Sequence, residues 1–229
     1  MDESVSEPQT TVWYLKRNRI FARVDENVLE GCDHLFTVCE HPRRTRLFDQ
    51  GDPSGLIYFL KRGRVRLSRL TEDGKEITIA MLGPRDLFGE EPIFGDATRT
   101  TIATCIEDSL VCTTRADQLF PLLTRHPAVT LNIAKYLKEQ RDEAATVIED
   151  LAYLKVSDRI VKLFERLALE HGVLDTGGTR IDVRLTHNDI ASLVGSTRET
   201  VSLEMSKLQR DGRILIRDRA VILPIAQTA

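Results

Sequence analysis

Residue types that can read DNA bases stand near the C-terminal end of the sequence. Ser196 and Thr197 are followed directly by Arg198 and Glu199. Arginine can donate two hydrogen bonds to guanine O6 and N7, and glutamate can accept one from cytosine N4. If Ser196 caps a helix, Arg198 and Glu199 lie in its first turn, which is the part of a recognition helix that enters the major groove. We therefore predict a base-reading surface at this position.

Two helix-start patterns place this surface in a helix-turn-helix. Thr186 with Asp189 has the spacing of a capping box, and so has Ser196 with Glu199. Gly195 lies between the two expected helices, where a tight turn favours a positive φ. The two helices are therefore expected to begin ten residues apart.

The second helix has one expected buried face and one expected outer face. Val201, Met205 and Leu208 recur at helical spacing and predict the buried stripe. The opposite face carries side chains that can touch bases and phosphates. Together with Arg198 and Glu199, the predicted DNA-binding residues on the two helices are Thr186, Ser196, Thr197, Ser202, Leu203 and Lys207.

Two short strands follow the second helix and predict a wing. They span residues 213–217 and 220–223, and Arg217 and Arg219 at the turn are candidate phosphate contacts. From Lys155 onward, twelve Lys and Arg stand against ten Asp and Glu, although the whole chain has a net charge of −3. The alternative is an ordinary pair of capped helices with a solvated face, but caps, glycine and wing together favour a winged helix-turn-helix that binds double-stranded DNA.

A second group of residues can bind an anionic ligand. Gly89 allows the backbone to approach a ligand, Glu90 can bind ribose hydroxyls, and Arg99 with Thr100 offers a charged fork and a hydroxyl to a phosphate. A turn closed by an ion pair is the alternative interpretation of the same residues.

The elements before and after this loop predict an antiparallel β-roll or jelly-roll. The segments 56–60, 65–70 and 77–82 are apolar or alternating, and Asp73-Gly74 lies in the turn that joins the last two. Turn dipeptides recur over residues 45–114, which is typical of successive short strands.

Beyond Leu119 the apolar period becomes helical and predicts a long helix. Its stripe either packs on the β-roll or forms the seam of a homodimer, in which Arg141 sets the register. We favour the dimer, because small alanines permit close approach of an identical helix. The predicted seam residues are Ala134, Leu137, Arg141, Ala144, Ile148 and Leu151.

These elements predict an α+β protein of three parts. Residues 1–125 form an effector-sensing β-roll, residues 126–155 a dimerisation helix and hinge, and residues 156–229 the winged helix-turn-helix. The composition, 41% hydrophobic and 29% charged, is typical of a globular protein.

Other classes of protein are disfavoured by the sequence. The acidic start and the lack of an apolar run of about 18 residues favour a cytoplasmic protein with no membrane partner. The five histidines show no metal-ligand spacing, and no catalytic set stands out, so neither a metal site nor an enzyme is expected. Cys105 and Cys112, on neighbouring expected strands, are either buried structural thiols, which we favour, or a redox pair.

Over residues 20–225 the sequence resembles the cyclic-AMP receptor protein/FNR family of bacterial transcription regulators. The order of roll, Gly-Glu to Arg-Thr loop, long helix and winged helix-turn-helix is the same. The stretches that match include Phe48-Asp-Gln-Gly-Asp52, Leu60-Lys-Arg-Gly63, Asp73-Gly-Lys-Glu76, Asp86-Leu-Phe-Gly-Glu90 and Leu151-Ala-Tyr-Leu-Lys-Val-Ser-Asp-Arg-Ile160.

The resemblance implies a homodimer that binds a near-palindromic operator and contacts RNA polymerase. It also implies that the roll binds a small effector, commonly a 3′,5′-cyclic nucleotide, so cyclic AMP and cyclic GMP are the candidate effectors. The effector would shift the population between two states of the dimer helix and of the hinge at residues 154–158.

Three features depart from the family. Cyclic-AMP-responsive members supply hydroxyl side chains from the dimer helix, where this sequence has Ala144 and Ala145, and the loop from Glu90 to Arg99 is short. Many members carry a guanine-reading arginine where this sequence has Leu203. The alternatives are a member active without cyclic nucleotide, through another effector, redox chemistry or expression level, or a nucleotide-binding module that regulates a protein partner.

Overall fold

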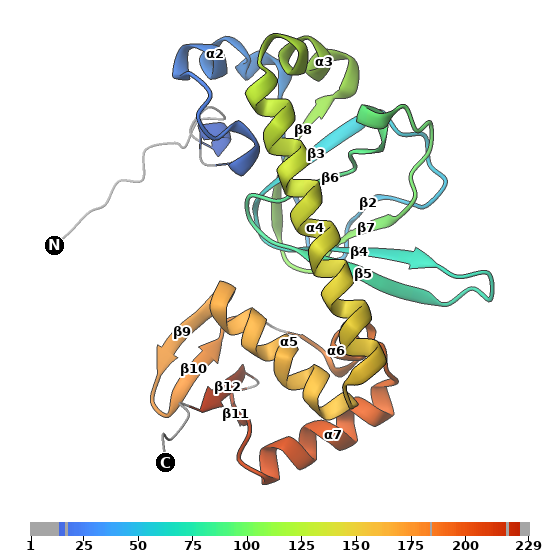
Figure 1. Ribbon diagram of the computed structural model, residues 1–229, viewed down its shortest axis with the longest axis vertical. Coiled ribbons are helices and arrows are strands. Elements are labelled where there is room, and N and C mark those ends of the chain that lie inside the picture. Colours follow the sequence, from blue (N-terminus) through green and yellow to red (C-terminus); the bar gives the residue numbers. More distant parts are fainter. Residues whose placement is uncertain (1–13, 17, 184, 219, 225–229) are drawn as a thin grey trace, which may run out of the picture. The chain divides into compact units, whose positions relative to one another are not determined.

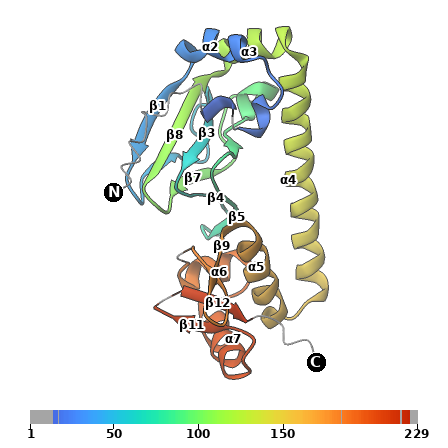
Figure 2. The same cartoon turned by 90° about the vertical axis from the view of Figure 1, so that its left-hand side faces the viewer.

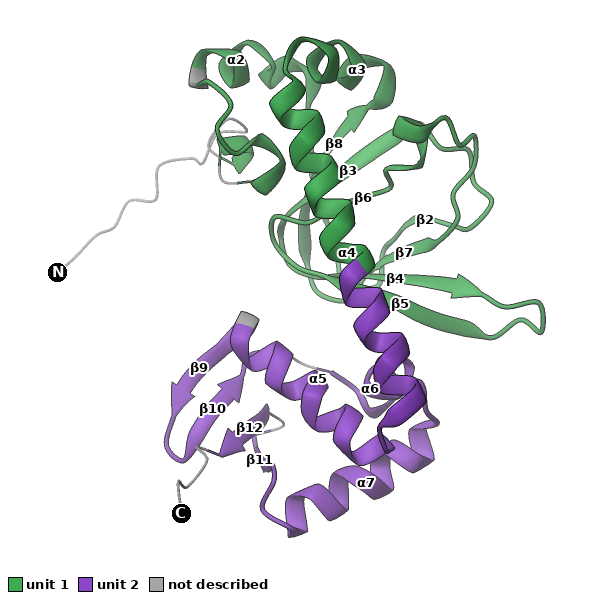
Figure 3. Cartoon of the chain, in the orientation of Figure 1, with its two compact units in different colours: residues 1–141 green, residues 142–229 purple. Residues whose placement is uncertain are grey.

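The computed structural model describes residues 14–16, 18–183, 185–218 and 220–224, and the chain divides into two compact units (Figure 3). Unit 1 is Met1–Arg141 and unit 2 is Asp142–Ala229. Helix α4 (Pro127–Tyr153) begins in unit 1 and ends in unit 2. No described helix has the length and apolar character needed to span a bilayer.

Unit 1 contains two four-stranded antiparallel sheets (Figure 1). One sheet has the order β1-β8-β3-β6 and the other β2-β7-β4-β5. The predicted roll and the β4-β5 hairpin are confirmed. The strands are β1 (Thr37–His41), β2 (Arg46–Phe48), β3 (Leu56–Arg62), β4 (Val65–Leu70), β5 (Glu76–Leu82), β6 (Leu87–Phe88), β7 (Ile102–Cys105) and β8 (Ser109–Arg115).

Strand β3 is buried on both faces, which explains its continuous apolar run. Ile57 and Phe59 enter one hydrophobic cluster, and Tyr58 and Leu60 enter another between the strands of the roll. A strand covered on both sides has no polar face to present to solvent.

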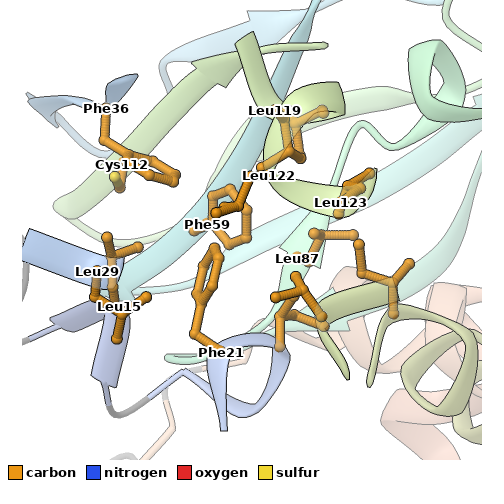
Figure 4. Packing of buried hydrophobic residues seen from close by; sticks show 14 of the residues in the cluster. Leu15, Phe21, Leu29, Phe36, Phe59, Leu87, Cys112, Leu119, Leu122 and Leu123 are labelled. Atoms are coloured by element: carbon orange, nitrogen blue, oxygen red, sulfur yellow. The ribbon is translucent and has the colours of Figure 1, made fainter. Parts of the chain in front are cut away.

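Short helices close one end of the roll (Figure 2). Phe21, Phe36 and Phe59 pack there with ring centroids 5.5 to 5.9 Å apart, within the cluster shown in Figure 4. The aromatic contacts join the N-terminal segment to β3. The short elements of unit 1 are η1 (Arg19–Phe21), α2 (Glu26–Gly31), η2 (Asp33–Leu35), η3 (Glu91–Phe94) and α3 (Ala116–Arg125).

The first half of α4 packs on the roll through a face that differs from the predicted seam. Val129, Ile133 and Tyr136, spaced four and three residues apart, are buried in the same hydrophobic cluster as Phe21 and Phe59. The Tyr136 hydroxyl donates a hydrogen bond of 2.9 Å to the Leu87 carbonyl. This stripe leaves the neighbouring face of the helix uncovered by unit 1.

The two buried cysteines, Cys105 and Cys112, lie in different sheets. Cys105 ends β7 and Cys112 lies on β8, so they are on consecutive strands, as expected, but those strands belong to different sheets. Both side chains are fully buried, and burial raises the pKa of the Cys112 thiol to about 11. A thiol with so high a pKa is a poor nucleophile, which favours the structural interpretation.

Unit 2 contains the end of α4, three further helices and a third four-stranded antiparallel sheet, of order β11-β12-β10-β9. Its core includes Ile160 and Phe164 from α5, and Val221 and Leu223 from the wing pack against it. The hairpin β9-β10 was not predicted from the sequence. The elements are α5 (Val156–His171), β9 (Gly172–Asp175), β10 (Gly178–Ile181), α6 (His187–Leu193), α7 (Arg198–Arg210), β11 (Leu215–Arg217) and β12 (Ala220–Pro224).

Candidate functional site

The first helix of the helix-turn-helix, α6, begins at a complete capping box. The Thr186 hydroxyl accepts a hydrogen bond of 3.2 Å from the Asp189 amide, and the Asp189 carboxylate accepts one of 2.9 Å from the Thr186 amide. Both ends of the first turn are therefore satisfied, as the sequence spacing predicts. This fixes where the helix starts in unit 2.

The second helix, α7, begins one residue later than predicted. Thr197 is the cap, and its hydroxyl accepts a hydrogen bond of 3.2 Å from the Thr200 amide. The predicted capping box of Ser196 with Glu199 is wrong, because the Ser196 amide donates to the Ala191 carbonyl at 2.9 Å and so belongs to the end of α6. Arg198 and Glu199 still lie in the first turn of α7.

Gly195 makes the turn between α6 and α7. Its φ is +60°, as expected for this position, and a Cβ atom there would lie 2.5 Å from Cδ2 of Leu151. Leu151 at the end of α4 thus approaches the turn. Lys162 on α5 also pairs with Asp150 at 2.7 Å, so the end of α4 is tied to the helices of unit 2.

Gly195→Ala is expected to lower the free energy of unfolding of unit 2 by more than the about 1–2 kcal/mol that an L-residue in the left-handed region costs, because the added Cβ would also meet Leu151. Gly212→Ala is a matched control, since Gly212 has a φ of +70° and nothing within 4 Å of the added Cβ. Denaturant titration followed by circular dichroism compares the two. The larger loss is expected at Gly195, and an unchanged stability there would contradict the tight turn.

The two faces of α7 are as predicted. Val201, Met205 and Leu208 are at most 3% exposed and form part of the core of unit 2. Arg198 and Glu199 are exposed, and within the described part of the chain neither side chain has a hydrogen bond or an ion pair. The Arg198 guanidinium and the Glu199 carboxylate are therefore available to an external partner.

The rest of the outer face is partly engaged within unit 2. The Ser202 hydroxyl lies 2.8 Å from Nδ1 of His187, a link between α6 and α7 that sequence reasoning missed. Leu203 is 56% exposed. Lys207 pairs with Glu204 at 2.7 Å, one turn away on the same helix. The exposed Leu203 side chain offers only apolar atoms, which fits contact with a thymine methyl.

The wing forms as predicted, with β11 paired to β12. Arg217 is exposed at its tip, and its Nη1 donates to the carbonyl and the hydroxyl of Thr176 at 3.2 and 3.0 Å. Arg219 lies outside the described residues. The wing arginine is thus held near the turn of the β9-β10 hairpin.

In the roll, two of the predicted anion-binding residues, Arg99 and Thr100, donate hydrogen bonds to a carboxylate of the protein itself, that of Glu91. The Arg99 side chain is 2% exposed, and it pairs with Glu91 at 2.9 Å. Its Nη1 also donates to the Gly89 carbonyl at 2.9 Å, and its Nη2 to the Leu56 carbonyl at 2.6 Å. The guanidinium of this residue is therefore buried and surrounded by acceptors.

Gly89 and two aromatic rings complete the setting of Arg99. Gly89 has a φ of +68°, and a Cβ atom there would lie 2.8 Å from Nη1 of Arg99. The guanidinium carbon lies 4.4 Å from the Phe48 ring centroid and 5.4 Å from that of Tyr58. The missing side chain at Gly89 therefore admits this arginine.

Glu91 is the partner that sequence reasoning missed. Burial disfavours its charged form, but hydrogen bonds from the backbone amides of Glu91 and Thr100 and from Arg99 outweigh burial and hold the pKa of Glu91 below its ordinary value. Burial raises the pKa of the neighbouring Glu90, which is half-buried. The pKa values of the two adjacent acids shift in opposite directions because burial dominates at Glu90, whereas hydrogen bonds from backbone amides and from Arg99 dominate at Glu91.

The predicted seam of α4 is mostly uncovered. Ile148 is 66% exposed and Leu151 is 44% exposed. Ala134, Arg141 and Ala144 are also exposed, whereas Leu137 packs partly against the core of unit 1. The second half of α4 therefore exposes two large apolar side chains, Ile148 and Leu151, to solvent in the single chain.

Two families match the chain. The cyclic nucleotide-binding domain matches residues 38–126 and includes the Arg99 site, and the Crp-like helix-turn-helix domain matches residues 155–227 and includes α6, α7 and the wing. The cyclic nucleotide-binding match makes cyclic AMP and cyclic GMP reasonable candidate effectors.

Curated proteins match over most of their length. A cyclic AMP receptor protein of Thermus thermophilus is 30% identical over 81% of this chain and 86% of its own, and a global nitrogen regulator of Synechocystis is 31% identical over 80% and 84%. The solved structure of the c-di-GMP-responsive regulator CLP of Xanthomonas campestris is similar with a TM-score of 0.77 and 26% identity, over 88% of this chain and 100% of its own.

Proposed function

This chain belongs to the CRP-like family of transcription regulators, and from that premise we propose that it binds DNA as a homodimer whose two α7 helices read a near-palindromic operator. The observation that carries the proposal is the first turn of α7, where Arg198 and Glu199 are exposed and unpaired within the described residues. Such a turn enters the major groove in helix-turn-helix proteins.

The second half of α4 is the proposed dimer interface. Ala144, Ile148 and Leu151 continue the spacing that begins at Ala134, and a second copy of the helix would bury them. A two-fold axis along α4 would repeat the recognition helix on the partner. Half-sites about 34 Å apart then place both helices on one side of the duplex.

The residues of unit 2 divide into base-reading and positioning groups. Arg198 and Glu199 are proposed to contact base edges, and Leu203 a thymine methyl. Phosphate contacts fix the register of the protein on the duplex without reading its sequence. The proposed positioning residues are Thr186, Ser196, Thr197, Ser202, Lys207 and Arg217.

The proposal is tested by comparing Arg198→Ala with Arg217→Ala. Arg198→Ala is expected to weaken binding to the preferred operator by about 1–3 kcal/mol for each half-site and to relax the choice of base. Arg217→Ala is expected to weaken all sequences alike and to reduce the slope of log affinity against log salt by about 1 for each half-site.

Fluorescence anisotropy with operator and scrambled duplexes, over a range of salt concentrations, measures both effects. Each variant is the control for the other, because both remove an exposed arginine of unit 2. The same loss of base preference in both variants, or in neither, would contradict the assigned roles.

Leu203→Arg is expected to change which base pair is preferred rather than to abolish binding. The leucine offers only apolar contact, whereas arginine at the same exposed position can donate to guanine. Binding of wild type and variant is compared across operators that differ at single base pairs. An unchanged order of preference would show that residue 203 does not face the bases.

Regulation is proposed to act through the roll. An effector with different affinity for two states of the dimer shifts the fraction that can bind DNA. Cyclic AMP and cyclic GMP are the first candidates to test, and activity without a nucleotide is the second, since Ala144 and Ala145 offer no hydroxyls from α4. We also propose that the DNA-bound dimer contacts RNA polymerase.

A further inference from the structure

Three donors in the roll converge on one carboxylate. Nη1 of Arg99 lies 2.9 Å from Oε2 of Glu91. The Thr100 amide and hydroxyl donate to Oε1 of the same side chain at 3.1 and 3.2 Å. A guanidinium, an amide and a hydroxyl together are a donor set that binds phosphate as well as carboxylate oxygens.

The rest of the setting leaves Arg99 fixed and enclosed. Two backbone carbonyls and two aromatic rings hold its guanidinium, and its Nε is buried without a hydrogen-bond partner among the described residues. A buried charge of this kind needs a counter-charge. Glu91 is the acid that supplies it.

We propose that Glu91 is a built-in counter-anion that occupies the oxyanion site of Arg99 and Thr100 and closes it to an external phosphate. Arg99 and Thr100 already donate to Glu91. The phosphodiester of a cyclic nucleotide, which carries a single negative charge, can therefore reach these donors only by displacing Glu91. With Glu91 on these donors the effector site is latent rather than open.

The competition favours the internal acid. A group on a short flexible tether already has an effective concentration in the millimolar range. Glu91 is eight residues from Arg99 and belongs to the short helix η3, so it is held more closely than a flexible tether would hold it. The carboxyl also stays ionised at neutral pH, because its pKa lies below the ordinary value.

Removal of the carboxylate tests the proposal on the full-length protein without DNA. Glu91→Ala is expected to gain thermal stability from inorganic phosphate and from cyclic AMP, because a ligand that binds only the folded state stabilises it. The dissociation constant of wild type for each ligand, measured by calorimetry, is expected to be at least about tenfold higher than that of Glu91→Ala. Sodium chloride at equal ionic strength separates site binding from screening.

Two variants control for other causes. Glu91→Ala with Arg99→Met removes the guanidinium, and the gain from phosphate is expected to disappear. Glu107→Ala breaks the 3.2 Å pair with Arg64 elsewhere in the roll, where no second donor among the described residues contacts the carboxylate. It is expected to gain no response to phosphate.

The separate phosphate and nucleotide arms distinguish a simple oxyanion site from a nucleotide site, and a response to either in Glu91→Ala alone supports the latent site. Wild type that binds phosphate or cyclic AMP as tightly as Glu91→Ala would overturn the proposal. So would the absence of any response that depends on Arg99. If Glu91→Ala does not fold in either salt, the neutral Glu91→Gln decides by the same measurements. None of these results depends on operator binding.

Discussion

Ile148→Glu is expected to make the protein monomeric and to weaken its binding to a two-half-site operator by about 10²–10⁴-fold, the gain that linking two binding modules provides. Ile148 is 66% exposed on α4 and lies in the middle of the proposed seam. In a two-fold dimer the substitution would place two glutamates close together across the axis, where like charges repel.

Thr146→Glu is the matched control for this variant. Residue 146 is exposed on the same helix but points away from the seam, and its hydroxyl bonds only to the Asp142 carbonyl among the described residues. Sedimentation velocity and operator titration are measured for both variants. A dimeric Ile148→Glu protein with unchanged operator affinity would exclude this face of α4 as the interface.

Arg99→Leu is expected to lower the free energy of unfolding of the roll by about 3–5 kcal/mol. It leaves the Glu91 carboxylate, which is 9% exposed, without its charged partner, and it removes the contacts with the rings of Phe48 and Tyr58. Adding Glu91→Leu is expected to restore much of the loss, since replacing both members of a buried pair costs less than removing one. Urea titrations of wild type, Arg99→Leu, Glu91→Leu and the double variant give the coupling free energy of the pair. Additive losses of the two single variants would mean that the pair is not coupled.

The same pair makes a prediction about pH. The pKa of Glu91 is lower in the folded than in the unfolded state, so its stabilisation is fully present above the unfolded pKa and is lost as pH falls through the folded one. Arg99→Leu should already lack this stabilisation at neutral pH. Its unfolding free energy is therefore expected to fall less than that of wild type between about pH 5 and pH 3.

Local signals predicted local structure in unit 2. The box of Thr186 and Asp189 is formed by neighbouring residues, so its spacing alone placed α6 correctly. Ser196 has the same spacing to Glu199, but its backbone amide, which Glu199 would accept from in a capping box, donates to the Ala191 carbonyl at the end of α6. The start of α7 therefore depends on how the preceding turn closes, which sequence spacing does not determine.

Tertiary structure accounts for the other differences. The hairpin β9-β10 includes Leu174, which is 88% exposed, so it lacks the alternation that marks a half-buried strand. On α4, Val129, Ile133 and Tyr136 face the roll, on the face next to the stripe that the sequence emphasised, since Ile133 and Tyr136 directly precede Ala134 and Leu137. The Glu91–Arg99 pair joins two sides of a loop, and which of two adjacent acids reaches the arginine follows from the path of η3.

Sedimentation of the purified protein with a duplex chosen from a random-sequence pool tests the central claim most directly. We predict that the selected duplex carries two inverted half-sites, with centres about 10–10.5 base pairs apart, and that two chains bind it together. One chain bound to a single half-site, or selection of no preferred sequence, would contradict the account.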